Sequence, residues 1–477
     1  MAVLLHLSPV VLVMAMLVLL RRPPVQAALA GVAGVALLWL ADAGAPGLAA
    51  FSTALADTAV LFLSTAFVIV PGLGFVILIE RMGVNQALSQ WVRALGLGPA
   101  DQVVFIVLGL APLLEAMTGF GVSLIATVPL LLSLFERRAA LRMALAGMAI
   151  MPWGTLGLAT VIGASLAHVD AAAMASVSAL TSAPVFLVLG ALSLHLAGER
   201  GTRAWALLIG FWLLFVAVLH SISRWLGPEV AGVGAGLAVV LCMLARALRM
   251  RRDMQGAARW PRQAWPYPAL ALAIVLLKLL TLATQWDQRW IVQGAQVAWK
   301  PLASPGLALA LVLGLLLVRG VGNGVPLAGA LANRARRPLL TIFFFLAMSQ
   351  MMVKAGFLDG LVQLLSELAP SALAPIVALF GALAGYMTGS NVGGNAIFMP
   401  AIALLPESSR LLLAAVHNSA AGHAALGSLS IVMLVLGLAR TTAQEEGELV
   451  RFGFALACIN AALVALAALV LGGVGLV

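Results

Sequence analysis

The chain has 477 residues, of which 63% are hydrophobic and 9% are charged, and its formal net charge is +10 at pH 7. So few charged residues cannot cover the water-facing surface of a soluble protein of this length, and composition therefore predicts an all-α integral membrane protein without a large soluble domain. The positive charge does not indicate nucleic-acid binding, because the basic residues are spread over short loops instead of clustering with aromatic side chains on one surface.

Apolar runs, separated by charged residues or by glycine and proline, predict about 12 transmembrane helices. We place them near residues 3–20, 25–41, 58–80, 139–167, 171–196, 204–221, 229–248, 266–284, 301–318, 338–353, 409–438 and 450–475. Two further apolar stretches, 101–135 and 370–406, are interrupted by Thr-Gly-rich sequence. Each is compatible with a re-entrant hairpin or with a pair of full spans.

The distribution of lysine and arginine indicates an orientation. The first apolar run has no basic residue before it and Arg21 and Arg22 after it, which is the reverse of a cleavable signal peptide. Because positive loops are retained in the cytoplasm, placing these two arginines inside assigns most of the 27 basic residues to that side. We therefore expect a multi-pass protein of the cell inner membrane with both termini on the non-cytoplasmic side.

The chain contains an internal repeat at an offset of about 270 residues. Residues 115–122 are EAMTGFGV and residues 385–392 are GYMTGSNV. The correspondence extends to Pro129 with Pro400, Ala144 with Ala414, and Leu156-Gly157 with Leu426-Gly427. In the expected topology the two copies have opposite orientations, which predicts inverted repeats.

These repeats divide the chain into four segments. The predicted boundaries are N-terminal spans at 1–57, a first repeat at 58–200 with a broken hairpin near 115–123, linking spans and basic cytoplasmic loops at 201–337, and a second repeat at 338–477 with a broken hairpin near 387–395. Inverted repeats with interrupted helices are typical of secondary transporters, in which the two breaks meet at the substrate site.

The interrupted helices are the candidate substrate site. Glycine lets the backbone unwind and a ligand approach, and the N–H groups at the start of the next helix attract anions without any arginine. Hydroxyl and amide side chains then hold a second polar group of the substrate. The residues predicted to bind substrate are Thr118, Gly119, Phe120, Gly121, Ser123, Thr388, Gly389, Ser390, Asn391 and Asn395. The structural alternative is that Gly and Thr only allow close helix packing.

Three titratable residues are candidates for proton coupling. Glu115 is a lone carboxyl in an apolar stretch, where a charge is costly and by default functional, although a structural ion pair with Lys278 is the alternative. His417 and His423 lie in the sequence VHNSAAGH, and histidine serves in proton relays, although a membrane histidine is often only hydrogen-bonded between helices. We place the helix break of the eleventh span at these histidines. Asp57, His6 and His220 are expected at the membrane interface.

The residues around the two breaks resemble the lactate permease family of secondary transporters. LLEAMTGFG at 113–121 is similar to the family's Leu-Glu-Gly-x-x-Gly-Phe-Gly segment, and TGSNVGGNAIF at 388–398 to its Thr-Gly-Ser-Asp-x-x-x-Asn segment. Asn391 replaces the family's aspartate, Ala116 replaces a glycine, and a late segment with a lysine is missing, with the stretch around His423 in its region. The resemblance implies proton-coupled transport of 2-hydroxycarboxylates.

The sequence therefore predicts proton-coupled symport of lactate or a similar 2-hydroxymonocarboxylate. Sodium-coupled or differently coupled transport of a dicarboxylate or sulfonate is the alternative, and a channel is the rival from another class. The expected partners are a small organic anion, a proton or sodium, and the lipid bilayer, with no nucleic acid. No nucleophile, base and metal-ligand constellation is present, and Cys242 and Cys458 have no ligand spacing, so we expect neither an enzyme nor a cofactor or metal.

Overall fold

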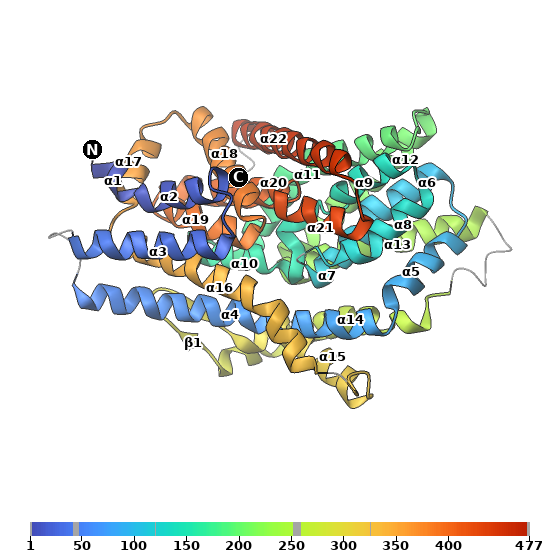
Figure 1. Cartoon of the computed structure of the whole chain (residues 1–477), viewed down its shortest axis with the longest axis horizontal. Helices are drawn as coiled ribbons and strands as arrows, with labels where there is room; N and C mark the ends of the chain where they lie inside the picture. Colours follow the sequence, from blue (N-terminus) through green and yellow to red (C-terminus); the bar gives the residue numbers. More distant parts are fainter. Residues whose placement is uncertain (1, 42–46, 120, 251–258, 325, 475–477) are drawn as a thin grey trace.

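The computed structural model describes residues 2–41, 47–119, 121–250, 259–324 and 326–474, and almost all of its ordered elements are helices (Figure 1). Among the described residues, 10 helices are long and apolar enough to cross a membrane, and two bent helix pairs raise that number to as many as 12. The prediction of an all-α, multi-pass membrane protein is confirmed at this level.

The first half of the chain ends with a long helix, α11. Its elements are α1 (Ala2–His6), α2 (Ser8–Val18), α3 (Pro24–Ala41), α4 (Leu48–Arg81), α5 (Val84–Ala94), α6 (Pro99–Val104), the π-helix η1 (Phe105–Leu110), α7 (Ala111–Thr118), α8 (Ser123–Leu134), α9 (Arg137–Ala146), the 3₁₀ turn η2 (Met151–Trp153), α10 (Gly154–Ala167) and α11 (Ala171–Leu196).

The middle of the chain contains α12 (Thr202–Leu226), α13 (Pro228–Met250), η4 (Arg262–Ala264), α14 (Pro266–Thr284), η5 (Trp286–Arg289), the antiparallel strands β1 (Val292–Gln293) and β2 (Ala298–Trp299), η6 (Pro301–Ala303) and α15 (Pro305–Val318). The last part contains α16 (Leu327–Lys354), α17 (Asp359–Ser366), α18 (Pro370–Thr388), α19 (Asn391–Ala403), α20 (Glu407–Ala425), α21 (Leu429–Ala439) and α22 (Ala443–Val474).

Several expected spans are bent or divided. The first is interrupted at Leu7, two residues before Pro9, which cannot donate a backbone hydrogen bond. The span expected at 139–167 is the pair α9 and η2–α10, bent by 53°. The expected break at the histidines of the eleventh span is wrong, because α20 runs unbroken to Ala425 and the interruption follows at 426–428.

The order of elements from α4 to α11 recurs from α16 to α22. Each series has a long helix, a short helix, a buried helix, a glycine break, a shorter helix and then a further interrupted pair before a final long helix. The breaks correspond in position, and each has a glycine with a positive φ angle: φ is +68° at Gly119 and +64° at Gly389, which glycine adopts without steric cost. The sequence repeat is thus accompanied by a repeated series of elements.

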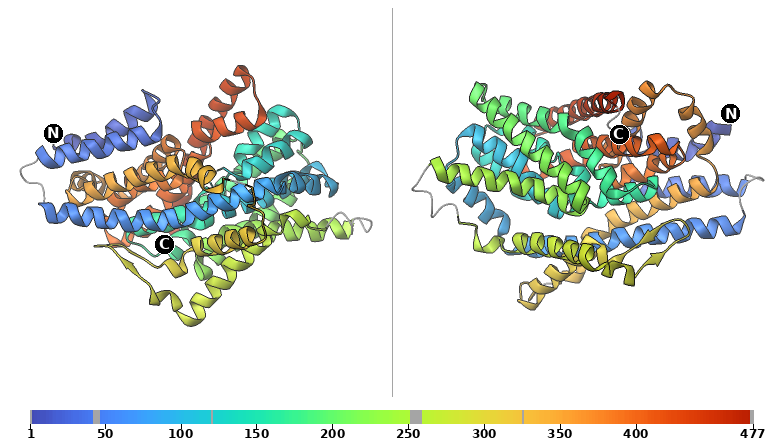
Figure 2. Two further views of the ribbon diagram at one scale, coloured as in Figure 1. Left: turned by 60° about the horizontal axis from the view of Figure 1, so that its bottom comes forward. Right: turned by 180° about the vertical axis from the view of Figure 1, so that it is seen from behind.

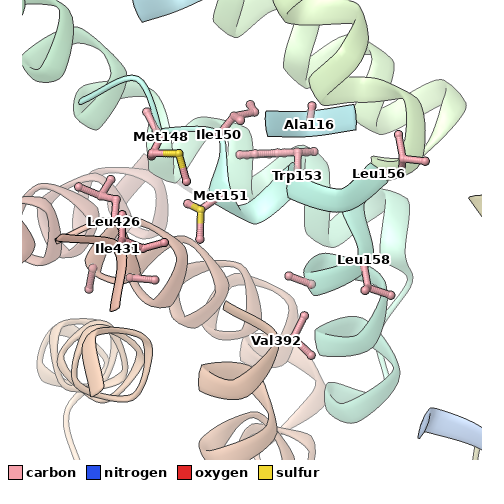
Figure 3. Packing of buried hydrophobic residues seen from close by; sticks show 14 of the residues in the cluster. Ala116, Met148, Ile150, Met151, Trp153, Leu156, Leu158, Val392, Leu426 and Ile431 are labelled. Atoms are coloured by element: carbon pink, nitrogen blue, oxygen red, sulfur yellow. The ribbon is translucent and has the colours of Figure 1, made fainter. Parts of the chain in front are cut away.

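The two series pack against each other in the middle of the molecule, where α10 and α11 contact α19 and α20 (Figures 1 and 2). Apolar side chains fill the space around this interface: Met148 and Met151 from the first series lie near Leu426 and Ile431 from the second, and Trp153 lies beside Ala116 (Figure 3). Outside it, α4 packs against α15 and α16, and α3 packs against α16. The polar residues of the candidate site are therefore held inside a predominantly apolar bundle.

Candidate functional site

The first break lies between α7 and α8. Gly119 ends α7, and a Cβ atom at this position would overlap the side chain of Thr155 in α10. Thr118 is buried, and its hydroxyl donates a hydrogen bond to the Leu114 carbonyl, 2.6 Å away in the same helix. Phe120, predicted to bind substrate, lies outside the described residues. Close packing and the absence of room for a side chain explain the glycine at 119.

Glu115 binds the start of α8 from within the protein. Its side chain is fully buried. One carboxyl oxygen accepts the Gly121 N–H at 3.1 Å, and the other accepts the Ser123 hydroxyl at 2.6 Å. A helix N-terminus favours a negative group, and here the protein's own carboxyl occupies it. The suggested pairing of Glu115 with Lys278 is wrong, because Lys278 Nζ lies 3.3 Å from Glu229 Oε2.

The second break lies between α18 and α19. The hydroxyl oxygen of Thr388 lies 2.8 Å from the Ala384 carbonyl oxygen and 2.9 Å from the Ser390 carbonyl oxygen, so its single hydrogen is shared between these two acceptors. Ser390 caps α19, and its side-chain oxygen accepts the Gly393 N–H at 3.4 Å. This break has no carboxyl because a Cβ at Gly385, which corresponds to Glu115, would overlap the Ala421 backbone.

Asparagines next to the second break join the two series of helices. Asn391 and Asn395 each donate from Nδ2 to Asn418 Oδ1 at 3.0 Å. Asn418 in turn donates to Thr160 Oγ1 at 3.0 Å and to Ser178 Oγ at 3.2 Å. These five residues, which we call the amide network, are buried and belong to α10, α11, α19 and α20. Hydrogen bonding among them compensates the cost of burying polar groups.

The hydrogen bonds of Asn395 determine which ring nitrogen of His417 carries a proton. Asn395 Nδ2 donates to the Ala159 carbonyl at 2.9 Å, so Asn395 Oδ1 is the atom left to accept. That oxygen lies 3.3 Å from His417 Nδ1, which therefore carries the hydrogen in the neutral ring. His417 Nε2 is buried and has no hydrogen-bond partner within the described residues. This nitrogen is an unoccupied hydrogen-bond acceptor beside the amide network.

His423 does not join this group. Neither ring nitrogen has a hydrogen-bond partner within the described part of the chain, and the ring packs edge-on against Phe186 of α11 with centroids 5.5 Å apart. Because α20 is continuous, the six-residue spacing from His417 leaves the two histidines on different faces of the helix. The structure thus places Asn391, Asn395 and His417 together, and leaves His423 elsewhere.

An unwound segment separates Glu115 from the amide network. Thr155, Leu156 and Gly157 all have positive φ angles. A Cβ atom at Gly154 would lie 3.8 Å from Glu115 Oε1, while the Pro152 carbonyl accepts the Thr160 hydroxyl at 2.6 Å. Non-helical backbone inside a membrane protein must be satisfied by protein or by water in a cavity. The segment 151–157 therefore connects the two predicted polar sites physically.

Three residues expected at the interface have specific partners. Asp57 is fully buried, and its Oδ1 accepts the backbone N–H groups of residues 295, 296 and 297 at 2.7, 2.9 and 3.4 Å, while Lys354 Nζ lies 3.3 Å from its Oδ2. Protein groups therefore surround the Asp57 carboxyl, and its position at the membrane interface stays a prediction. His6 stacks on Phe357 with ring centroids 4.7 Å apart, and His220 Nδ1 lies 3.1 Å from the Ser176 hydroxyl.

Sequence reasoning missed Asn418, Thr160, Ser178 and the unwound segment as parts of the site. Asn418 had a usable signal, since an amide inside an apolar helix is costly unless it is paired. The two hydroxyl residues had none, because serine and threonine are common in membrane helices, where they bond to their own backbone. Among the described residues, no group of three or more His, Cys, Asp or Glu side chains could hold a metal ion.

Comparison with known proteins does not assign the chain to a protein family. No model of a protein family matches the chain, and no curated protein matches it. The similarity to the lactate permeases therefore depends on the two motifs at 113–121 and 388–398, and the function has to be argued from the site itself.

Proposed function

We propose that the chain is a secondary active transporter that couples entry of a small organic anion to protonation of Glu115. Lactate or a similar 2-hydroxymonocarboxylate is the proposed substrate. The observation that carries the proposal is the buried Glu115 carboxyl at the start of α8, where its oxygens accept the Gly121 N–H and the Ser123 hydroxyl. These are the donors that a substrate carboxylate would use.

The coupling follows from competition between two carboxylates. A buried site with one set of donors does not accommodate two anions without a large electrostatic cost. Protonation neutralises Glu115 and weakens its hold on Gly121 and Ser123, because hydrogen bonds to a charged acceptor are about twice as strong as neutral ones. The substrate anion then takes those donors. The loaded site carries the same net charge as the empty one, with one proton and one anion gained.

The second break supplies the uncharged part of the proposed pocket. The 2-hydroxyl group of the substrate requires a partner that both donates and accepts, which asparagine and serine side chains provide. Asn391 Oδ1 is buried and has no hydrogen-bond partner among the described residues, so it is the acceptor that we assign to this hydroxyl. His417 Nε2 is a second proton acceptor beside it.

We further propose that the two series are inverted repeats and that 101–135 and 370–406 are re-entrant hairpins. The repeated order of elements, with a glycine of positive φ at each break, supports this arrangement. In such proteins, alternating access comes from movement of one repeat against the other around a central site. The packing of Thr155 beneath Gly119 and of Leu434 against Gly121 means that the first break must open to admit a substrate.

Uptake of labelled lactate into proteoliposomes tests the proposal. We expect accumulation above the external concentration when the outside is acidic, and a loss of that accumulation when a protonophore is added. The same assay with sodium replaced by choline distinguishes the alternative of sodium coupling, and competition with dicarboxylates and sulfonates distinguishes the alternative substrates. Flux that neither saturates nor runs uphill would indicate a channel and contradict the proposal.

A further inference from the structure

Two adjoining hollows lie at one end of α12 and α13. The first, of about 380 Å³, is lined by the loop before α6, the loop before α12 and the end of α13. The second, of about 470 Å³, runs along α12 beside α13. Both are lined by Arg203, Leu207 and Arg246, so the two hollows meet at a pair of guanidinium groups. We call the two together the α12 groove.

The first hollow, which we call the head of the α12 groove, contains charged side chains of both signs. Arg246 Nε lies 3.3 Å from Asp101 Oδ1. Arg203 and Glu199 also line the first hollow, and neither forms an ion pair within the described residues. One hollow at the end of the helices therefore contains an unpaired arginine, an unpaired glutamate and the ion pair between Arg246 and Asp101. This distribution suits a ligand that has both charges, and it disfavours a purely anionic one.

The remainder of the α12 groove is apolar. Its α12 residues recur at the spacing of one helix face: Leu207, Gly210, Phe211 and Leu214. A Cβ atom at Gly210 would meet no atom within 4 Å, so the glycine leaves the groove open. From Arg203 to Leu214 the helix rises roughly 16 Å at 1.5 Å per residue, which is most of the length of an acyl chain. The neighbouring Ile209 and Leu213 are exposed, as expected for a face turned to lipid.

We propose that the α12 groove binds phosphatidylethanolamine. The lipid phosphate lies between Arg203 and Arg246, since guanidinium matches phosphate geometry. The primary ammonium donates hydrogen bonds to Glu199 and to Asp101, whose carboxylate also pairs with Arg246. One acyl chain follows α12 over Gly210. Phosphatidylcholine has the same charges, but its quaternary nitrogen has no N–H to donate. Phosphatidylglycerol has no cation. It places an uncharged hydroxyl group beside Glu199, where the carboxylate requires a positive charge.

Native mass spectrometry of the delipidated protein tests this assignment. The protein is incubated with an equimolar mixture of the ethanolamine, choline and glycerol lipids with identical acyl chains, and the bound lipids are counted. We expect the ethanolamine lipid to be enriched about tenfold over each competitor, the effect of about 1.4 kcal/mol. Glu199→Gln should reduce the preference over the choline lipid, with Asp101 as the remaining acceptor of the ammonium group, and Arg203→Gln should reduce binding of all three lipids.

Two further variants distinguish the head of the groove from its apolar part. Gly210→Leu fills the groove and should reduce binding of all three lipids by about tenfold without changing their ratio. Arg224→Gln, at the other end of α12 and exposed, is the matched control and should behave as the wild type. Far-UV circular dichroism confirms that each variant is folded, and Gly210→Ala replaces the leucine variant if that one does not fold.

The alternative outcomes overturn the proposal. Preferential binding of the glycerol lipid would show a site for anionic lipid, and equal binding of ethanolamine and choline lipids would show that Glu199 does not recognise the ammonium group. A preference in the folded Glu199→Gln variant that equals that of the wild type, or an equal loss in Arg224→Gln, would place the bound lipid elsewhere. None of these outcomes depends on whether the protein transports an organic anion.

Discussion

Replacing Glu115 with glutamine should free the start of α8 without changing the shape of the side chain. The wild-type carboxylate accepts two hydrogen bonds there. A hydrogen bond to a charged group contributes about 1 kcal/mol more than a neutral one, so the substitution should weaken the internal competitor by about 2 kcal/mol in total. Since 1.4 kcal/mol is a factor of ten, substrate should bind to the variant about 30-fold more tightly at alkaline pH.

The pH dependence follows from the same reasoning. In the wild type, lactate affinity should rise as the pH is lowered and Glu115 takes up its proton, whereas the glutamine variant should bind with one affinity between about pH 5 and about pH 8. Isothermal titration calorimetry on the purified protein measures both. In proteoliposomes the variant should exchange internal for external lactate but should not accumulate lactate in response to a proton gradient.

Glu407→Gln is the matched control, because this carboxyl at the start of α20 is exposed. It should retain the wild-type pH dependence. Ser123→Ala keeps the titrating group and removes one of its donors, so it should leave the pH dependence in place and change the affinity by less than Glu115→Gln. Lactate affinity that rises at low pH as steeply in the folded glutamine variant as in the wild type would refute the competition between the two carboxylates.

Three other substitutions test separate parts of the molecule. Gly385→Ala should lower the melting temperature by several degrees, because the added Cβ overlaps the Ala421 backbone. The control Gly437→Ala, whose Cβ would meet no atom within 4 Å, should not lower it. Equal melting temperatures of the two variants would contradict the close packing of α18 on α20. Asn418→Leu removes the acceptor of one N–H of Asn391 and of one N–H of Asn395, at about 1–3 kcal/mol each. Thermal unfolding should show a larger loss than for Asn323→Leu in an exposed turn. His417→Asn should lower lactate accumulation in proteoliposomes more than His423→Asn does, and the reverse order would exclude His417 Nε2 as the second proton acceptor.

The sequence predicted features that depend on local composition. Apolar runs gave the helical membrane class, and the glycine breaks at 119 and 389 were located because Gly with hydroxyl residues is conspicuous in apolar sequence. Glu115 was conspicuous as a lone carboxyl. Its partners, Gly121 and Ser123, lie within eight residues of it along the chain. Short-range contacts of this kind are accessible from motif spacing.

Long-range pairing was not accessible. Asp57 looked interfacial because it precedes the expected span at 58–80, but α4 begins at Leu48 and places Asp57 beside backbone amides about 240 residues away. Lys278 was the partner suggested for Glu115 in the structural alternative, whereas its Nζ lies beside Glu229 in α13, a helix that packs against α14. In both cases the partner of the charged residue is determined by the packing of helices, which hydropathy does not specify.

The Asp57 carboxyl has a mechanical consequence. It accepts hydrogen bonds from the turn between β1 and β2 and lies beside Lys354 at the end of α16, so one side chain fastens a connecting loop to two long helices. Those helices are also packed directly on each other. Because Asp57 joins them, α4 and α16 resist sliding past each other. Any movement between the two series must therefore occur where the backbone is already irregular. Segment 151–157 has that property, and it lies between Glu115 and the amides. Displacement there would carry Pro152 and Gly154 together, so the positions of Glu115 and of the asparagines would change at the same time.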